Sequence, residues 1–467
     1  MTSLSLAYGH VASNLGDLAI NEGFHQLCRD AGIHPPQLIL TRKARPKYLS
    51  RMKQQLPEAV LKESWPPSLN ENSEERIREL LALARAVIDP GAWARETGLA
   101  RTDVVVANAG EHLFESSTGE NAIDLIWRVL PLLAASTMGK PAIQLPATIG
   151  PFLSDRGNLM LDTILETASA WAVRDVSSRQ YLSRSRRIAP IVTHLDPAFF
   201  LPPIKRQRAE NPVLAIIPRL EGFGMRVGTK SSKYFNSRAR QSGYQGSLAY
   251  RWAVAVGEHY LLRGWDVDLF VQTEADRSLV EAIAKQLRTR AGDRAITIRT
   301  PGSVTEYRQW IGRSHALVSS RFHACILGLS VGVPSVGVYH EAHWLKMPGL
   351  YSLLGQPGQA VALAEEGDDR FVSVLRALAR ADSKQGAFER TIAEQKKEAI
   401  AWFQNAVRQD AAPRSHATLR QRLLVSISEL LQHEQELLEA SWNERSSALL
   451  QKVEDAVSAL ESKPMSD

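Results

Sequence analysis

The segment "SSRFHACILGLSVGVPSVGVYHE", residues 319–341, decides the fold class of this chain. Its apolar middle, 324–331, predicts a buried helix, Gly-Val-Pro at 332–334 predicts a turn, and "SVGVYH" at 335–340 predicts a buried strand. The preceding run "HALVSSR" ends at Arg321 and has the composition of a further strand. Strand, helix, turn and strand in this order predict two parallel strands joined by a helix.

The same alternation of strand and helix patterns occurs throughout the first 384 residues. In the first half, "TMGKPAIQLP" (137–146) passes from a helix through Gly-x-Pro into a strand, as "SVGVPSVGVY" (330–339) does in the second. The proline-rich, charged stretch "LPPIKRQRAENP" (201–212) predicts a linker between the halves. We therefore expect two Rossmann-like, doubly wound α/β domains, 1–203 and 212–384, that face a cleft at the carboxyl ends of their strands.

A third region, 385–467, lacks strand patterns and predicts a helical tail. Apolar residues recur there at spacings of three, four and seven, which is typical of an imperfect heptad seam. The seam consists of Leu423, Ile427, Leu430, Leu437, Leu450, Val453, Val457 and Leu460. Such a tail either packs on its own protein or forms a homo-oligomer or partner contact as a coiled coil, and both interpretations fit the pattern.

Composition limits the partners and the compartment. The net charge of +6 and the pI of about 9.2 favour an anionic ligand or a negatively charged membrane surface, and they also fit plain solubility. No nucleic-acid module is recognisable. Cys28 and Cys325 both lie in apolar helical patterns, which excludes a disulfide framework. Without a secretory signal or an apolar run of ~20 residues, we expect a cytoplasmic protein that meets a membrane only as a peripheral partner at its inner face.

Two predicted corners between a strand and a helix contain candidate site residues. In the first, Gly16 permits a tight turn and Asp17 is predicted to cap the following helix, which by itself explains the segment that begins at Asn14. The corner also follows a strand, so we expect Asn14, Gly16 and Asp17 to face the cleft. In the second, Asn108 and Gly110 could let backbone amides approach an anion, although no phosphate-loop motif is present.

Charged residues at two strand ends of the second half are further candidates. Arg219, which ends "VLAIIPR", is either a boundary residue or an anion ligand, and the long basic stretch 221–247 after it is a lid or a solvated loop. Arg321 and His323 lie at a strand end or a helix amino terminus, and both geometries favour an anion. A structural histidine is the alternative, but burying two such polar groups without a ligand is costly. A metal site is not expected, since no second ligand has a recognisable spacing.

Five segments, taken in order, resemble segments of the polysaccharide pyruvyl transferases. "SSRFHACILGLSVGVPSVGVY" resembles the family's Ser-Arg-Leu-His-Ala…Gly-Val-Pro segment, and "SNLGDLAI" resembles its Asn-x-Gly-Asp-x-Ala-Ile opening. "GKPAIQLPATIGPF", "AVRDVSSRQYL" and "DPAFFL" resemble its Gly-Lys-Pro…Gly-Ile-Gly-Pro-Phe, Arg-Asp-x-x-Ser…Leu and Asp-Pro-Ala-Phe segments. The resemblance runs from about residue 14 to 340 and does not cover the tail after about residue 400.

The resemblance implies a glycosyltransferase-B-like arrangement of the two domains. It also implies transfer of a pyruvyl group from phosphoenolpyruvate to two hydroxyls of a sugar, in a cell-surface polysaccharide or its lipid-linked precursor, with a cyclic ketal and phosphate as products. Arg219, Arg321 and His323 occupy positions to which the family assigns a role. The chain departs from the family at "NAGEHLFESS", where relatives have a glycine-rich run, at Phe322 in place of leucine, and at Lys346, which comes later than the family's Tyr-x-x-Lys.

Phosphoenolpyruvate needs several cations, because it carries a carboxylate and a phosphate. Arginine suits planar, bidentate anion recognition, so Arg219 and Arg321 are the first candidates and Lys346 the next. A histidine has an ordinary pKa near ~6.5, so His323 can donate a proton to the methylene carbon or to the leaving phosphate.

The sugar hydroxyl must lose a proton, and Asp17 is the first candidate for taking it, with Glu111 and Glu341 behind it. We expect no metal and no cofactor, since arginines and helix amino termini stabilise phosphate charge. Two other functions remain open. One is a nucleotide-sugar-dependent glycosyltransferase of the same shape, in which Glu341 would grip a ribose. The other is a non-catalytic protein that uses its tail for assembly.

Overall fold

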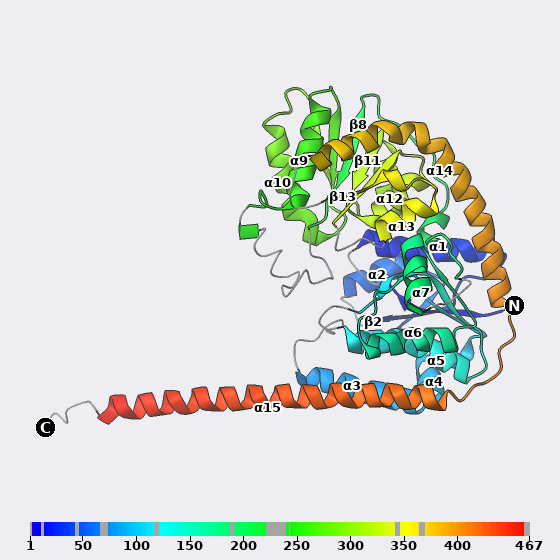
Figure 1. The fold of residues 1–467 in the computed structure, drawn as a ribbon, viewed down its shortest axis with the longest axis vertical. Helices are drawn as coiled ribbons and strands as arrows, with labels where there is room; N and C mark the ends of the chain where they lie inside the picture. The colour runs from blue at the N-terminus through cyan, green and yellow to red at the C-terminus, as the bar shows by residue number, and fades with distance from the viewer. Residues whose placement is uncertain are drawn as a thin grey trace.

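A computed structural model describes residues 2–10, 14–42, 46–65, 73–115, 121–186, 191–220, 240–241, 243–340, 346–363 and 369–461. The chain forms two α/β domains, each built on a parallel sheet, and a long helical extension (Figure 1). Glu341, one of the predicted site residues, and most of the predicted lid at 221–247 lie outside the described residues.

The first domain contains a seven-stranded parallel sheet. Its strands are β1 (Leu4–Gly9), β2 (Leu38–Arg42), β3 (Val60–Trp65), β4 (Val104–Ala107), β5 (Gly110–Leu113), β6 (Ala142–Ile149) and β7 (Ala170–Val173). Its helices are α1 (Leu15–Asp30), α2 (Pro46–Gln55), α3 (Ser73–Ile88), α4 (Pro90–Thr97), η1 (Leu99–Arg101), α5 (Ala122–Thr137), α6 (Asp155–Thr167), α7 (Val176–Arg186) and η2 (Pro197–Phe200). The strand order is β3-β2-β1-β4-β6, and β5 and β7 also pair with β6. The run 102–110 therefore holds β4 and the first residue of β5, with Asn108 and Ala109 between them.

The second domain has the strand order β10-β9-β8-β11-β12-β13, which is the order of a doubly wound nucleotide-binding sheet. Its strands are β8 (Val213–Ile217), β9 (Asp266–Phe270), β10 (Ile296–Arg299), β11 (Ala316–Ser319), β12 (Ser335–His340) and β13 (Ala360–Leu363). Its helices are α9 (Leu248–Leu261), η3 (Glu274–Asp276), α10 (Arg277–Arg288), α11 (Val304–Gly312), α12 (Phe322–Ser330), α13 (Lys346–Leu353) and η5 (Pro357–Gln359). Within the segment quoted first, β11 pairs in parallel with β12 across α12, which confirms the predicted unit.

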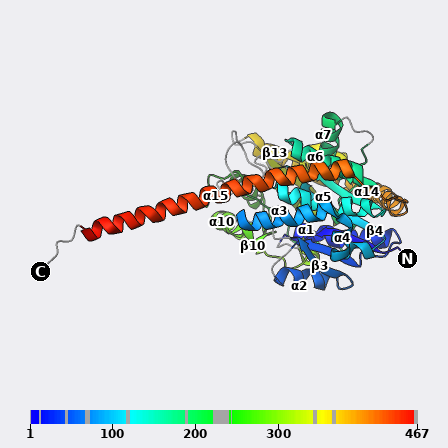
Figure 2. The same cartoon turned by 90° about the horizontal axis from the view of Figure 1, so that it is seen from below.

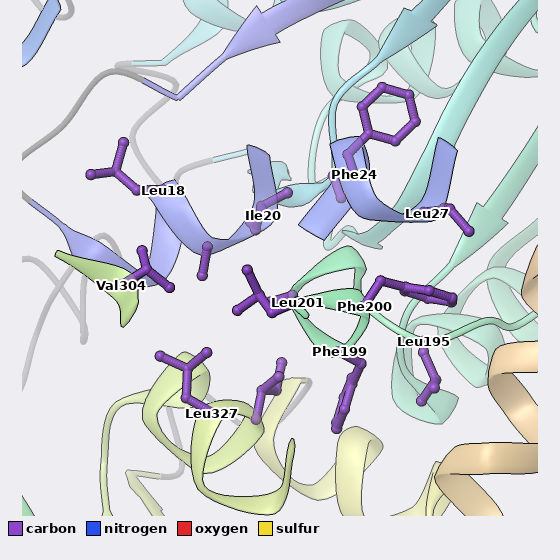
Figure 3. Close-up of a cluster of buried hydrophobic side chains, with 14 of the residues drawn as sticks. Leu18, Ile20, Phe24, Leu27, Leu195, Phe199, Phe200, Leu201, Val304 and Leu327 are labelled. Carbon is purple, nitrogen blue, oxygen red and sulfur yellow. The ribbon is translucent and has the colours of Figure 1, made fainter. Parts of the chain in front are cut away.

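A shared apolar core joins the two domains. Leu18 and Phe24 on α1, Phe199 in η2 and Leu327 on α12 of the second domain belong to one buried apolar cluster (Figure 3). The contact between α1 and η2 requires a glycine, since a Cβ at Gly23 would lie 2.0 Å from a backbone oxygen of η2. The carboxyl ends of both sheets are thereby held facing each other.

Two long helices, α14 (Asp369–Val407) and α15 (Ala417–Glu461), complete the chain. Helix α14 crosses from the second domain to the first, where the Phe403 ring lies 5.5 Å from that of Phe24 (Figure 1). Helix α15 then packs against α3 and α6, with Leu423 and Ile427 buried, and its far half projects beyond the body of the protein (Figures 1 and 2). The predicted seam thus packs on its own domain at Leu423, Ile427 and Leu430, while an oligomeric role for the far half stays a prediction.

None of the helices in the described part of the chain combines the length and apolarity needed to cross a bilayer.

Candidate active site between the two sheets

A cavity of about 380 Å³ lies between the carboxyl ends of the two sheets. Its lining residues are Tyr8, Gly9, His10, Asn14, Asp17, Glu111, His112, Arg128, Arg174, Arg219, Gln272, Arg321, Phe322, His323 and Lys346. Within the described ranges, no three His, Cys, Asp or Glu side chains are grouped so as to hold a metal ion.

Two helix amino termini meet in the wall of this cavity. Asn14 caps α1, and its Oδ1 accepts hydrogen bonds from the Gly16 backbone (3.1 Å) and, across the cleft, from Gln272 Nε2 (2.8 Å). Arg321 occupies the N-cap position of α12. The positive ends of both helix dipoles therefore favour an anion between them. The prediction that Asp17 caps α1 was wrong, because Asn14 does so and Asp17 lies in the first turn.

The imidazole of His323 lies between two carboxylates. Its Nδ1 is 4.0 Å from Asp17 Oδ1, and its Nε2 is 3.6 Å from Asp196 Oδ2. Asp196 is buried and forms a 2.6 Å ion pair with Arg174. Burial alone would raise the pKa of Asp196, but the neighbouring His323 ring and the charge of Arg174 outweigh it and hold the pKa well below its usual range. A full negative charge therefore stays beside His323 throughout the neutral range.

Two arginines of the second domain line the same cavity. Arg321 Nη2 donates to Asp276 Oδ1 at 2.5 Å and to Thr273 Oγ1 at 3.1 Å, and the Asp276 side chain is completely buried. Burial lowers the pKa of Arg219 to about 10, and the nearby charge of Arg321 contributes to this shift. Arg219 therefore remains charged at neutral pH, and the two guanidinium groups together favour an anion.

Lys346, the first residue of α13, joins the two domains across the cavity. Its Nζ forms an ion pair with Glu111 of the first domain. Burial lowers the pKa of Lys346 to about 8, although Glu111 acts to raise it. Helix α13 is seated closely on α7, since a Cβ at Gly349 would lie 2.8 Å from the Cβ of Asp175.

Aromatic rings and a further arginine line the first-domain side of the cavity. The Tyr8 ring stacks on that of His112 at 5.1 Å, and the Arg128 guanidinium lies 4.2 Å from the Tyr8 ring centroid. The backbone of Tyr8 has a φ of +67°, which is rare for a bulky residue and typical of strained functional sites. His10 follows, with its Nε2 2.8 Å from the carbonyl oxygen of Ala109.

Seven of the predicted site residues line the cavity. They are Asn14, Asp17, Glu111, Arg219, Arg321, His323 and Lys346. Gly16 and Gly110 instead make room for neighbouring side chains. A Cβ added at Gly16 would lie 2.6 Å from the Cβ of His323. A Cβ added at Gly110, whose φ is +139°, would lie 2.8 Å from His112 Nδ1. Asn108 is completely buried and donates to the Tyr8 carbonyl oxygen and to Asn21, so it supports the wall from behind.

Several residues that shape the cavity were not among the predicted site residues, and they include the charged or titratable Arg174, Asp196, Arg128 and His10. Arg174 follows the buried end of β7, so the rule that selected Arg219 would have found it. Asp196 belongs to the "DPAFFL" segment, but nothing in that segment alone distinguishes it as a site residue. Arg128 lies inside α5 and His10 in a loop, and nothing in their spacing distinguishes them.

Solved structures of similar architecture include glycosyltransferases and epimerases. A glycosyltransferase from Rickettsia africae ESF-5 has a TM-score of 0.50 at 10% identity, covering 88% of this chain and 100% of that one. UDP-GlcNAc 2-epimerase from Neisseria meningitidis bound to UDP-GlcNAc has a TM-score of 0.48 at 11% identity, covering 87% and 100%. At 10% identity, the similarity to the Rickettsia enzyme shows the fold alone, a glycosyltransferase-B-like pair of domains. A comparison with curated proteins found no match.

A family model described as polysaccharide pyruvyl transferase matches residues 14–342. The match covers more than two thirds of the chain, begins at the cap of α1 and ends just before α13. It includes Arg219, Arg321 and His323. The chain is therefore a transferase, and it belongs to the polysaccharide pyruvyl transferase family.

Proposed function

We propose that this enzyme transfers the pyruvyl group of phosphoenolpyruvate to two hydroxyls of a saccharide, forming a cyclic ketal and releasing phosphate. The observation that carries the proposal is the convergence of Arg219, Arg321 and Lys346 on one cavity beside His323. Phosphoenolpyruvate carries a carboxylate and a phosphate, and each needs charged donors when it is taken out of water. Two helix amino termini supply further donors at the same place.

The cations are held in position by buried or bridging carboxylates. Asp276 orients Arg321, and Glu111 orients Lys346. A guanidinium or ammonium that is already ordered loses little conformational freedom when the ligand binds. The cavity is therefore preorganised for a small, multiply charged anion.

His323 has the geometry of a proton donor to the donor substrate. Asp17 and Asp196 flank its two ring nitrogens, so each N–H of a protonated ring would face a carboxylate. Proton transfer from His323 to the methylene carbon makes the central carbon of phosphoenolpyruvate electrophilic, and a sugar oxygen can then attack it. Asp17 stays a candidate for taking the sugar's proton.

The acceptor that we propose is a sugar of a cell-surface polysaccharide or of its lipid-linked precursor, reached from the inner face of a membrane. The net charge of +6 supports contact with an anionic surface. Binding to vesicles with and without anionic lipid tests this part separately.

The decisive experiment incubates the purified full-length chain with phosphoenolpyruvate and a panel of saccharides. We expect release of inorganic phosphate that depends on the saccharide, and mass spectrometry should show a pyruvate ketal on the product. Arg219→Gln should raise the KM for phosphoenolpyruvate by roughly tenfold or more, because a hydrogen bond between charged groups is worth ~1.5–3 kcal/mol. Arg288→Gln is the matched control, since Arg288 is exposed at the end of α10.

Turnover with a sugar nucleotide in place of phosphoenolpyruvate would replace the proposal by a glycosyltransferase activity. No turnover with either donor would favour the non-catalytic alternative.

A further inference from the structure

His10 is held rigidly in the wall of the cavity, although it belongs to no recognised motif and precedes the segment that the family model matches. Its backbone N–H donates to Asn21 Oδ1 at 3.1 Å, and Asn21 Nδ2 donates back to the His10 carbonyl oxygen at 2.8 Å. Asn21 in turn accepts a 2.9 Å hydrogen bond from the buried Asn108. A loop residue fixed by a buried chain of amides is positioned as firmly as one on a strand.

The hydrogen bonding of His10 determines its tautomer. Nε2 lies 2.8 Å from the Ala109 carbonyl oxygen, and because a carbonyl only accepts, Nε2 must carry a proton. Burial lowers the pKa of His10, the charges of Arg128 and His323 contribute to the lowering, and Asp17 opposes it. The neutral ring therefore offers the lone pair of Nδ1 as a proton acceptor.

The groups around His10 come from five elements. Asp17 lies on α1, Arg128 on α5 and His323 on α12. The rings of His112 on β5 and Tyr8 on β1 lie edge-on to His10, 5.9 and 6.1 Å away. Of these, only Asp17 is anionic, so it is the group that would stabilise a proton on His10.

Arg128 offers the complementary donor. Its Nε donates to Asp124 Oδ2 at 2.8 Å, and its Nη2 pairs with the same oxygen. The Asp124 carboxylate thus compensates the charge of Arg128. Its Nη1 is buried and has no hydrogen-bond partner among the described residues. A buried donor beside a cavity is costly unless a ligand supplies an oxygen.

We infer that His10 and Arg128 form the acceptor subsite, in which Arg128 Nη1 donates to one sugar hydroxyl and His10 Nδ1 takes the proton of the attacking hydroxyl. This inference rests on the proposed function. It assigns the role of base to His10 and leaves Asp17 to stabilise the imidazolium ions.

The reaction balances with these groups. The O–H bond of the attacking hydroxyl breaks, its oxygen bonds to the central carbon of phosphoenolpyruvate, and its proton goes to His10. The methylene carbon takes a proton from His323 and becomes a methyl group. When the second hydroxyl attacks, its O–H bond breaks and its proton goes to the departing phosphate, which leaves with the electron pair of the broken bond between carbon and oxygen. The proton held by His10 then returns through solvent to His323. Over the whole cycle, one hydroxyl proton replaces the proton given to the methyl carbon, and the other ends on the released phosphate.

The test uses the full-length chain and whichever saccharide supports phosphate release in the panel described above. His10→Ala should lower kcat by roughly 10²–10⁴-fold, the usual contribution of a general base, while the affinity for phosphoenolpyruvate measured by calorimetry stays unchanged. Added imidazole should restore part of the turnover. Arg128→Gln should raise the KM of the saccharide more than that of phosphoenolpyruvate. His259→Gln, on α9, is the matched control.

Several outcomes would overturn the inference while the proposed function stands. One is a His10→Ala enzyme with the turnover and pH profile of the wild type. Another is a His10→Ala enzyme that binds phosphoenolpyruvate normally but is not rescued by imidazole, since that marks a structural role. If the variant does not fold, His10→Gln, whose side-chain amide can still donate to Ala109, must show the same loss of kcat for the inference to survive. Failure of the wild-type enzyme with every saccharide would overturn the proposed function itself, and this inference with it.

Discussion

His323 of the second domain packs directly against Gly16 of the first, where no other residue would fit. A Cβ at Gly16 would lie 2.6 Å from the Cβ of His323 and 2.7 Å from its Nδ1. The first turns of α1 and α12 can approach each other this closely only because position 16 lacks a side chain. The catalytic proposal for His323 thus depends on a glycine far away in the sequence.

Gly16→Ala should therefore displace the imidazole without removing it. Overpacking of this kind costs ~1–3 kcal/mol, so we expect a folded protein with a lowered Tm and a turnover reduced by more than about tenfold. Gly358→Ala, where an added Cβ would meet nothing within 4 Å, controls for the loss of glycine. Equal turnover in the two variants would show that the position of His323 does not matter.

Turnover should depend on pH through Lys346. Because burial lowers its pKa to about 8, Lys346 is charged below that pH and neutral above it. We expect the KM for phosphoenolpyruvate to rise as the pH increases through about 8, since one of the cations that bind the anion is lost. Lys346→Arg keeps its charge and should not show this rise. If the arginine variant shows the same rise, another group is responsible.

Arg321→Ala should abolish transfer and also destabilise the fold. The buried Asp276 would lose its partner, and the unpaired charge would cost ~3–5 kcal/mol. Adding Asp276→Asn removes the unpaired charge, so the double variant should recover much of the Tm while remaining inactive. Thermal unfolding and phosphate release measure the two effects. Recovery of activity in the double variant would contradict a role for Arg321 in binding the donor.

Two truncations should separate the halves of α15. Removing residues 441–467 should leave the Tm and the turnover close to wild type and change only the oligomeric state measured by light scattering. Removing 415–467 should also lower the Tm, because Leu423 and Ile427 belong to the core of the first domain. If the shorter truncation leaves the oligomeric state unchanged, the far half of α15 does not mediate assembly.

Hydrophobic periodicity was sufficient to predict the α/β class and the two facing sheets. It also placed Arg219, Arg321 and Asp17 correctly at the cavity, because the ends of parallel strands share one edge of a sheet. The same rule failed for Asn108. A polar residue that follows a strand can turn inward, and here its amide supports Tyr8 and Asn21 from behind the wall.

What the sequence by itself determined was therefore the fold class, the family and the corners that carry charge, since these follow from local periodicity and short motifs. Only the tertiary structure decided which groups meet: Asp196 beside His323, Asp276 behind Arg321, and Glu111 opposite Lys346. These pairs lie on different elements, and two of them cross between the domains. Their contacts depend on the relative orientation of the two sheets, which the shared apolar core fixes. That orientation is a property of the whole packed chain, and no local sequence pattern contains it.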